Sequence, residues 1–403
     1  MLSYQQARET VISQTKSHGN SRQTFSVPIH DALGHILAEE IRTDREYPPF
    51  DRSTRDGYAV HSAEAQPNST LRCAGEIKAG DTVHAPLASG TCVQIMTGAA
   101  LPPGADAVVM IEFTGREGDR ISFHRPTESG QNFVPRGSEA RARDVALSPG
   151  LRLGYAELAV AAQVGHAALQ CYKKPRVAIL STGDEVVPIT ETPSPFHIRN
   201  SNSVSLAAQV QLAGGTPVPL GNALDRVDDL SAKIEQGLRE EILVLSGGVS
   251  MGKYDLVESV LKGMGADFYF DAVAIRPGKP AVFGRCGNTL IFGLPGNPVS
   301  TMVTFQLFVI PAIDILSGTW PRSLPILEAA LAEAIKEKSG LTHFLPARLT
   351  WKDSYPQVRV LRWQGSGDIA ALTQANCFAI VPADHPDIPV GNRVSVLPRA
   401  DVL

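Results

Sequence analysis

The chain is short of the features that mark several large classes of protein. Only 19% of its 403 residues are charged, and a net charge of −4 leaves no basic excess for binding nucleic acid or an anionic membrane. Its five cysteines are far apart in the sequence, odd in number and without a CxxC pair, which excludes a disulfide framework and a zinc site. We therefore expect reduced thiols and a cytoplasmic location.

Membrane and targeting signals are missing as well. The segment Met1–Arg8 lacks the basic and apolar regions of a signal peptide. The longest apolar run, Val299–Ile313, contains Gln306 and is shorter than the ~18–20 residues of a membrane span. The chain also shows no internal repeat and no low-complexity segment.

The chain has 403 residues, which is more than the ~250–300 that a single hydrophobic core usually holds. Its pattern of strands and helices also changes along its length. Short strands with turn residues fill its second quarter, strands alternate with helices in its third, and short strands return at the end. These patterns predict a multidomain α/β protein whose central domain has three layers and a mostly parallel sheet. The expected domains are an α+β linking domain, an all-β insertion, this α/β domain and a small β-barrel, at 1–46 plus 134–172, 47–133, 173–321 and 322–403. Within the linking domain we expect helices at about Asp31–Ile41 and Leu151–Leu169.

The most informative stretch begins with the apolar run Ile242–Leu245, which is typical of a buried parallel strand. Glycines follow it, and then apolar residues recur at helical spacing; this strand, turn and helix geometry collects anions. Gly247, Gly252 and Lys253 fit the P-loop pattern, but Tyr254 stands where that motif needs Ser or Thr. We therefore predict a phosphate-facing loop of another kind.

Two further loops of unusual sequence should leave the same edge of the sheet. They begin at Ser181-Thr-Gly-Asp-Glu and Leu294-Pro-Gly-Asn-Pro, and each follows a predicted strand. Beside them, Ile275-Arg-Pro-Gly-Lys-Pro holds two cations three residues apart between prolines. Because ligands bind at the carboxyl ends of parallel strands, the set predicts a site for an anionic ligand.

Several ordered blocks carry a resemblance to a known family. They are Ser53-Thr-Arg-Asp-Gly-Tyr-Ala, Ile95-Met-Thr-Gly-Ala-Ala-Leu-Pro-Pro-Gly-Ala-Asp, the loops named above, Asn200-Ser-Asn, His343-Phe-Leu-Pro-Ala-Arg and Gln364-Gly-Ser. Together they resemble the molybdopterin molybdenumtransferase (MoeA) family, which includes the E domain of gephyrin. The resemblance implies a central domain like that of the adenylylating protein MogA.

The resemblance also implies an activity, substrates and partners. The reaction is insertion of molybdate into adenylylated molybdopterin, with release of AMP and a requirement for Mg²⁺. It implies a homodimer whose active site is shared between subunits, with a molybdopterin adenylyltransferase and acceptor molybdoenzymes as further partners. The implied catalytic carboxylates are Asp56, Glu139, Glu185, Asp225 and Asp255, the last three being candidate metal ligands. The implied substrate-binding residues are Thr97, Ser181, Thr182, Gly183, Asn202, Gly247, Gly248, Ser250, Arg276, Lys279, Pro295, Asn297, Pro298, Arg348 and Ser366.

Each candidate also has a purely structural interpretation, because turns and helix caps use the same residue types. Asp56-Gly57 is a type I′ hairpin signal, and an acid near a helix start can act as a cap. On this view Glu185 and Asp255 are caps, Asp225 is a solvated loop acid, and Arg276 and Lys279 are surface charges.

One block departs from the family pattern. Glu139 stands where the family has a catalytic Asp, Ser138 replaces Glu, and Arg143 replaces Gly. Val134 and Arg55 also differ from the usual Arg and Met. These changes keep open a non-catalytic molybdopterin-binding or scaffold role, and an adenylyltransferase activity is a further alternative. The choice between molybdate and tungstate is open too, because the two oxyanions have the same charge and nearly the same size.

Overall fold

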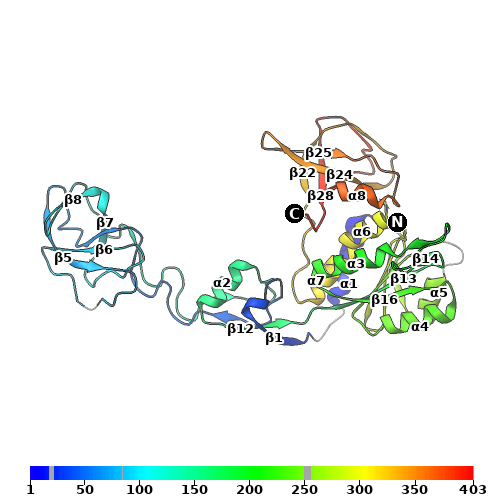
Figure 1. Cartoon of the computed structure of the whole chain (residues 1–403), viewed down its shortest axis with the longest axis horizontal. Helices are drawn as coiled ribbons and strands as arrows, with labels where there is room; N and C mark the ends of the chain where they lie inside the picture. The colour runs from blue at the N-terminus through cyan, green and yellow to red at the C-terminus, as the bar shows by residue number, and fades with distance from the viewer. Residues whose placement is uncertain (18–21, 84, 249–255, 403) are drawn as a thin grey trace.

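The computed structural model describes residues 1–17, 22–83, 85–248 and 256–402. The molecule is elongated (Figure 1): the sheet formed between residues 57 and 123 lies at one end, and the central α/β domain and the C-terminal barrel lie at the other. The linking segment, with its own short helix, lies between them. The architecture is the predicted multidomain α/β fold.

The central domain is built on a six-stranded sheet. Its first four strands in spatial order pair in parallel and the last two pairings are antiparallel, so β20 alone runs against the others, which confirms the prediction of a mostly parallel sheet. In that order the strands are β16 (Thr216–Ala223), β13 (Arg176–Thr182), β17 (Ile242–Ser246), β21 (Thr289–Leu294), β20 (Val282–Cys286) and β18 (Asp267–Phe270).

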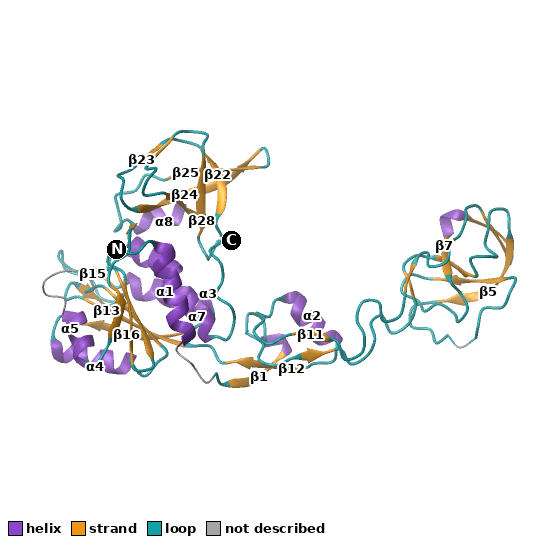
Figure 2. Ribbon diagram, turned by 180° about the vertical axis from the view of Figure 1, so that it is seen from behind, coloured by secondary structure: helices purple, strands orange, loops and turns teal. Residues whose placement is uncertain are grey.

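Both faces of this sheet are covered, which makes the three predicted layers. Along β17, Ile242 and Val244 face one apolar core, while Leu243 and Leu245 face a second one, so the strand has no polar side. Figure 2 shows helices on either side of the sheet. The first core is closed by α1 (Tyr4–Ser17), α3 (Ser201–Ala213), α6 (Pro298–Thr304) and α7 (Ile310–Leu316), and the second by α4 (Val227–Gly237) and α5 (Leu256–Gly263).

The apolar run near residue 300 forms one continuous helical segment. A π-helical turn, η3 (Phe305–Val309), joins α6 to α7, giving an apolar helical segment of 19 residues. Its length and composition would suit a membrane span, and the described chain has one such helix. However, 89% of its apolar 18-residue stretch is buried inside the protein, which is typical of a core helix.

The C-terminal domain is a closed barrel, as predicted. Five strands form the ring, and β24 closes it by pairing with both β25 and β26. The ring order is β24 (Thr342–Lys352), β25 (Tyr355–Val360), β22 (Leu327–Leu331), β28 (Arg393–Pro398) and β26 (Cys377–Val381). The short elements β23 (Ile335–Lys336), β27 (Asp387–Ile388) and α8 (Ile369–Gln374) complete it. Strand β19 (Ile275–Arg276) leaves the central domain and pairs with β24, so the cationic segment joins the two domains.

The described part of the insertion is a six-stranded sheet with one short 3₁₀ turn. Its order is β7 (Ala107–Met110), β4 (Gly57–Val60), β6 (Thr91–Ile95), β5 (Thr70–Ile77), β9 (Arg120–Phe123) and β8 (Thr114–Glu117), with η2 (Ile111–Phe113) after β7. Gly57 begins β4 between two partner strands, and a Cβ there would lie 1.9 Å from the carbonyl oxygen of Val109. The hairpin-turn interpretation of Asp56-Gly57 is therefore wrong.

The linking domain contains less helix than the sequence predicts. The expected helix at Asp31–Ile41 is wrong: only η1 (Ile29–Asp31) forms, and Ile36 and Leu37 instead make β-bridges to Arg152 and Cys171. The second expected helix is shorter, because only α2 (Tyr155–Gln163) forms. The domain's strand pairs are β1 (Thr24–Pro28) with β12 (Ala168–Tyr172) and β2 (Ile41–Arg42) with β11 (Val145–Leu147). A further pair, β3 (Arg52–Ser53) with β10 (Phe133–Val134), leads into the insertion.

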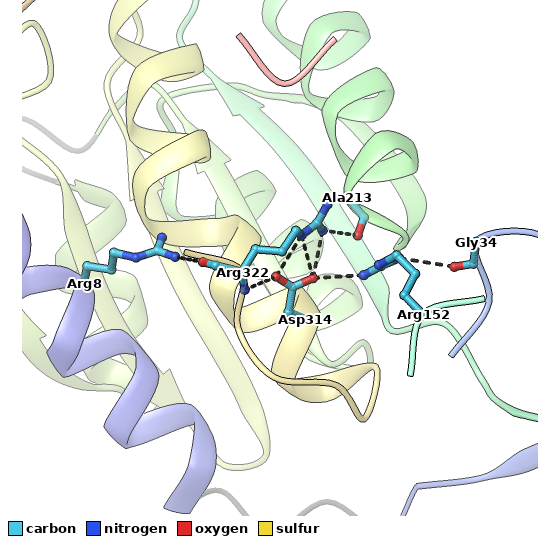
Figure 3. Close-up of polar contacts among 6 residues, drawn as sticks. All are labelled: Arg8, Gly34, Arg152, Ala213, Asp314 and Arg322. Atoms are coloured by element: carbon cyan, nitrogen blue, oxygen red, sulfur yellow. Dashed lines mark hydrogen bonds and ion pairs between the residues drawn. The ribbon is translucent and has the colours of Figure 1, made fainter. Parts of the chain in front are cut away.

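A buried carboxylate ties these parts together (Figure 3). The side chain of Asp314, at the end of α7, is 0% exposed and accepts hydrogen bonds from Arg152 at 3.0 Å and from Arg322 at 2.8 Å. Arg152 also donates to the Gly34 carbonyl, and Arg8 donates to the backbone of Arg322. One acid thus holds the linking domain and the segment that enters the barrel against the central domain.

Replacing Asp314 with alanine should lower the free energy of unfolding by about 3 kcal/mol, because two partly buried arginines lose their partner. This lies at the low end of the ~3–5 kcal/mol range, since the arginine side chains keep 31% and 43% exposure. The matched control is Asp228→Ala, which removes an ion pair with Arg226 exposed on both sides and should leave stability nearly unchanged. Equal unfolding midpoints for the two variants in a denaturant titration would contradict the argument.

Candidate functional site

The three predicted loops meet at one edge of the central sheet. The carboxyl ends of the neighbouring strands lie in register, with Ser181 beside Ser246 and Ser246 beside Leu294. A cleft of about 650 Å³ opens there. It is lined by residues from all three loops and from the start of α3, including Ser181, Thr182, Gly183, Glu185, Asn202, Asp225, Gly247, Gly248, Pro295, Asn297 and Pro298.

Hydrogen bonds between the loops fix the floor of this cleft. The Asn202 amide donates to Ser246 Oγ at 2.8 Å and to the Gly296 carbonyl at 2.7 Å, so it joins α3 to two of the loops. Ser181 Oγ donates to Asn200 Oδ1 at 3.0 Å, and the same oxygen caps α3 by accepting from the Ser203 N–H. These bonds therefore hold the described floor of the cleft together in the absence of a ligand.

One polar atom on the floor is left for a ligand. Thr182 Oγ1 is buried and has no hydrogen-bond partner among the described residues. Gly248 crowds it: the backbone there has φ 60°, and a Cβ would lie 2.5 Å from this oxygen. A buried hydroxyl without a partner costs free energy, so a ligand that bonds to it would be stabilised.

One wall of the cleft is acidic. Glu185 and Asp225 both line it, and Asp184 accepts a hydrogen bond from the Asp225 backbone N–H at 3.0 Å. Burial, together with the carboxylates of Asp184 and Glu185, raises the pKa of Asp225. A cation bound between Glu185 and Asp225 would relieve this repulsion.

These two acids fit a magnesium site. Mg²⁺ commonly takes one or two protein carboxylates together with phosphate oxygens of the substrate. No group of three or more His, Cys, Asp or Glu side chains is arranged for metal binding within the described ranges. The third expected ligand, Asp255, lies outside those ranges, as does the substrate-binding candidate Ser250.

A second hollow, of about 530 Å³, adjoins the first and shares Pro280, Pro295, Asn297 and Gly367 with it. It is cationic: Arg276 and Lys279 line it, and both are exposed. Neither side chain makes an ion pair or a side-chain hydrogen bond with any described residue. The two cations are therefore available to an anion.

The C-terminal domain completes this second hollow. Ser366 lies in its lining, accepts a hydrogen bond from the Asn297 amide at 2.8 Å, and accepts another at its carbonyl from the Val299 N–H. Arg348, in contrast, lies on the exposed side of β24, donates to the Gln374 carbonyl at 3.0 Å and lines neither hollow.

Three predicted residues lie far from both hollows in the same chain. Asp56 and Thr97 belong to the insertion, at the opposite end of the molecule from the central sheet (Figure 1). Asp56 accepts hydrogen bonds from the Thr97 backbone N–H at 2.6 Å and from its hydroxyl at 2.8 Å, and these bonds lower the pKa of Asp56. Glu139 lies at the junction with the linking domain and pairs with Arg52 at 2.8 Å.

The sequence reasoning missed one charged residue of the cleft. Arg199 lies on β15 (Ile198–Arg199), which pairs with β14 (Val186–Val187) directly after Glu185. Its Nε donates to the Glu191 carbonyl at 3.0 Å. Arg199 stands just before the Asn200-Ser-Asn block, and that position was the one available signal.

Comparison with known proteins gives a consistent result along the whole chain. Three family models match in order: "MoeA N-terminal region (domain I and II)" at residues 2–165, "Probable molybdopterin binding domain" at 178–314 and "MoeA C-terminal region (domain IV)" at 328–398. A Bacillus subtilis protein named molybdopterin molybdenumtransferase is 34% identical over 386 residues, covering 93% of this chain and 90% of the relative.

Two further comparisons agree. A protein of the same name from Haemophilus influenzae is 32% identical and covers 99% of this chain and 98% of its own length. The crystal structure of a molybdopterin biosynthesis MoeA protein from Pyrococcus horikoshii superposes with a TM-score of 0.80 at 27% identity, covering 99% of this chain and 100% of the other. The likeness therefore extends to sequence and to the arrangement of domains.

Proposed function

The chain belongs to the MoeA family of molybdopterin molybdenumtransferases, and on this premise we propose that it inserts molybdate into adenylylated molybdopterin and releases AMP. The observation that supports the proposal is the pair of adjoining hollows, one with an acidic wall and one with two available cations. A substrate with a phosphoanhydride and a separate oxyanion needs both kinds of surface, side by side.

Each part of the site has a role in this reaction. The hydroxyl of Thr182 and the backbone of Gly247 and Gly248 would hold the pterin or phosphate groups by hydrogen bonds. Arg276 and Lys279 would hold molybdate next to them. Asn202, whose amide is already bonded to two loops, keeps the cleft at a fixed width.

Glu185 and Asp225 would hold Mg²⁺ in the cleft. The metal would supply charge stabilisation at the phosphoanhydride that is cleaved. The work of these side chains is to fix the position of the adenylyl phosphate against the molybdate pocket, since misplacement by ~1 Å can cost a hundredfold in rate.

One assay of turnover tests the proposal. Purified protein, adenylylated molybdopterin and Mg²⁺ should release AMP when molybdate is added, and active cofactor should appear in equal amount. An adenylyltransferase would instead release pyrophosphate in a parallel reaction supplied with ATP and molybdopterin, and a scaffold would bind the substrate without turnover in either reaction. Either of these outcomes would refute the assignment. The same assay with tungstate measures the preference between the two oxyanions.

Removal of both cations should weaken binding of the oxyanion. In the Arg276→Ala, Lys279→Ala double variant we expect the apparent Kd for molybdate to rise roughly ten- to hundredfold, corresponding to ~1.5–3 kcal/mol for a lost charge-assisted contact. Thermal stability should change little, because both side chains are exposed. The matched control removes the exposed cations Arg239 and Lys352, which line neither hollow. Unchanged molybdate binding by the first double variant would show that the anion binds elsewhere.

Loss of one acid should raise the metal requirement. For Glu185→Gln we expect the Mg²⁺ concentration that gives half-maximal AMP release to rise about tenfold, since the neutral amide is a weaker ligand. Glu191→Gln, an exposed acid of the same loop that does not line the cleft, is the control. A calorimetric titration of Mg²⁺ in the presence of AMP gives a readout independent of turnover. Identical Mg²⁺ curves for the two variants would exclude Glu185 as a ligand.

We also propose a homodimer in which one subunit completes the site of the other. The supporting observation is that Asp56, Thr97 and Glu139 lie away from the cleft of their own chain. A molybdopterin adenylyltransferase would supply the substrate, and molybdoenzymes would accept the product. We place the protein and these partners in the cytoplasm.

A further inference from the structure

Two of the five cysteines are neighbours in space although 18 residues separate them in sequence. Cys73 on β5 lies beside Cys92 on the adjacent strand β6, in parallel register. Both side chains face the same apolar core of the insertion, with Leu71 and Ile121. Cys92 is fully buried and Cys73 is half-buried, while the other three cysteines lie on separate elements, β12, β20 and β26.

The spacing of the two strands suits a covalent link. Adjacent strands lie about 4.7–4.9 Å apart, and a disulfide needs a Cα–Cα separation of about 4.4–6.8 Å with side chains on the same face. Register places Cys73 directly opposite Cys92. The pairing becomes irregular immediately after this point, between Cys73 and Glu76, so the strand can adjust there.

We propose that Cys73 and Cys92 are a redox-sensitive pair that forms an intramolecular disulfide when the protein meets a peroxide. The Cys73 thiolate attacks one peroxide oxygen and becomes a sulfenic acid, releasing water after proton uptake. Cys92 then loses its proton and its sulfur attacks the sulfenic sulfur of Cys73, so that the S–S bond forms, the S–O bond breaks, and the hydroxide takes up a proton and leaves as the second water. Two thiols and one hydrogen peroxide thus give one disulfide and two waters.

The surroundings of the two thiols assign the order of these steps. Cys73 is reachable from solvent and its Sγ donates to the Gly75 carbonyl at 3.4 Å. Burial and the neighbouring Cys73 thiol raise the pKa of Cys92 to about 12. Cys92 is therefore the resolving thiol, and disulfide formation should accelerate as the pH rises, because thiolate is the nucleophile.

The link has a defined consequence for the insertion. It closes residues 73–92 into a loop that joins β5 to β6 and includes part of the lining of a hollow of about 490 Å³. Arg72, Glu76 and Thr91, which flank the two cysteines, line the same hollow. Oxidation should therefore stiffen this end of the molecule and leave the cleft of the central domain unchanged.

The experiment uses the full chain, treated with hydrogen peroxide under native conditions and then alkylated. We expect a product lighter by two hydrogen atoms, a cross-linked peptide containing Cys73 and Cys92, and complete reversal by dithiothreitol. The unfolding midpoint of the insertion should rise by at least about 5 °C, because the unfolded chain is constrained.

Matched variants separate this outcome from simpler ones. Cys286→Ser removes the other half-buried thiol, which donates to the Met264 carbonyl, and should leave the cross-link intact. Cys73→Ser should abolish it. If the native chain instead yields only sulfinic acid at Cys73, or dimers linked through Cys73, the proposed pair is refuted. This result would not bear on molybdenum insertion, which the turnover assay tests separately.

Discussion

Glu139→Ala should lower the turnover of molybdenum insertion at least ~10²-fold, the range expected when an acid–base or electrostatic group is lost. The carboxylate lies half-exposed at the end of the linking domain, and among the described side chains it pairs with Arg52, at 2.8 Å. No residue of its own chain's cleft is among its contacts, so we expect it to act on substrate bound to the partner subunit.

The length of the side chain gives a sharper version of this prediction. Glu139→Asp restores the residue type of the family and should keep turnover within about tenfold of the parent, or roughly 1.4 kcal/mol in barrier. A residue that acts by charge tolerates this change, whereas a proton carrier at fixed geometry responds strongly to it. The alanine variant therefore tests whether the carboxylate is needed, and the aspartate variant tests whether the length of its side chain matters.

A matched control lies at the same junction. Glu46 is also half-exposed and pairs with an arginine, Arg136, so Glu46→Ala removes an equivalent ion pair near Glu139. It should leave turnover unchanged. A fully active Glu139→Ala enzyme, or equal losses in the two alanine variants, would mean that Glu139 has no special role and would favour a scaffold function at this junction.

Mixing two inactive chains should restore activity if the site is shared. Asp56→Ala removes the acid held by Thr97 in the insertion, and Glu185→Ala removes an acid of the cleft. In a randomly exchanged mixture, half of the dimers pair unlike chains, and each of those has one intact site. About a quarter of the parental activity should therefore return.

The control mixes the Asp56→Ala chain with a chain that carries both changes, which leaves no intact combination. Subunit exchange is followed independently by mass spectrometry of differently tagged chains. If the tags exchange and the first mixture remains inactive, then the two acids do not act in one shared site, and the proposal of a site completed by the partner fails.

The structural features predicted best from the sequence are those that depend on the local pattern of apolar residues. Val244 and its neighbours in β17 are apolar on both faces, and only a sheet covered on both sides can bury such a strand. The helix expected at Asp31–Ile41 failed because Ile36 and Leu37 gain more from bridges to distant strands than from a helix interrupted by Gly34, whose φ is 77°.

The functional site was likewise predictable from local pattern only in part. Ser181, Ser246 and Leu294 end neighbouring parallel strands, so their loops could be brought together from strand order alone. Only its place next to Asn200 in the sequence pointed to Arg199, because the position of Arg199 in the cleft depends on how a loop folds back to pair with Val187. The position of Glu139 relative to the cleft could not be found, since it depends on the path of the chain between domains.

The Asp314 contact has a consequence for the order in which the protein is made. Arg8 and Arg152 leave the ribosome before Asp314, but Arg322 follows it by eight residues, and Arg322 provides its shortest contact. The carboxylate therefore lacks its principal partner until the chain has been extended into the barrel. A nascent chain that stops at the end of α7 carries a half-paired buried charge, and we expect the central domain to reach its final stability only after translation has passed residue 322.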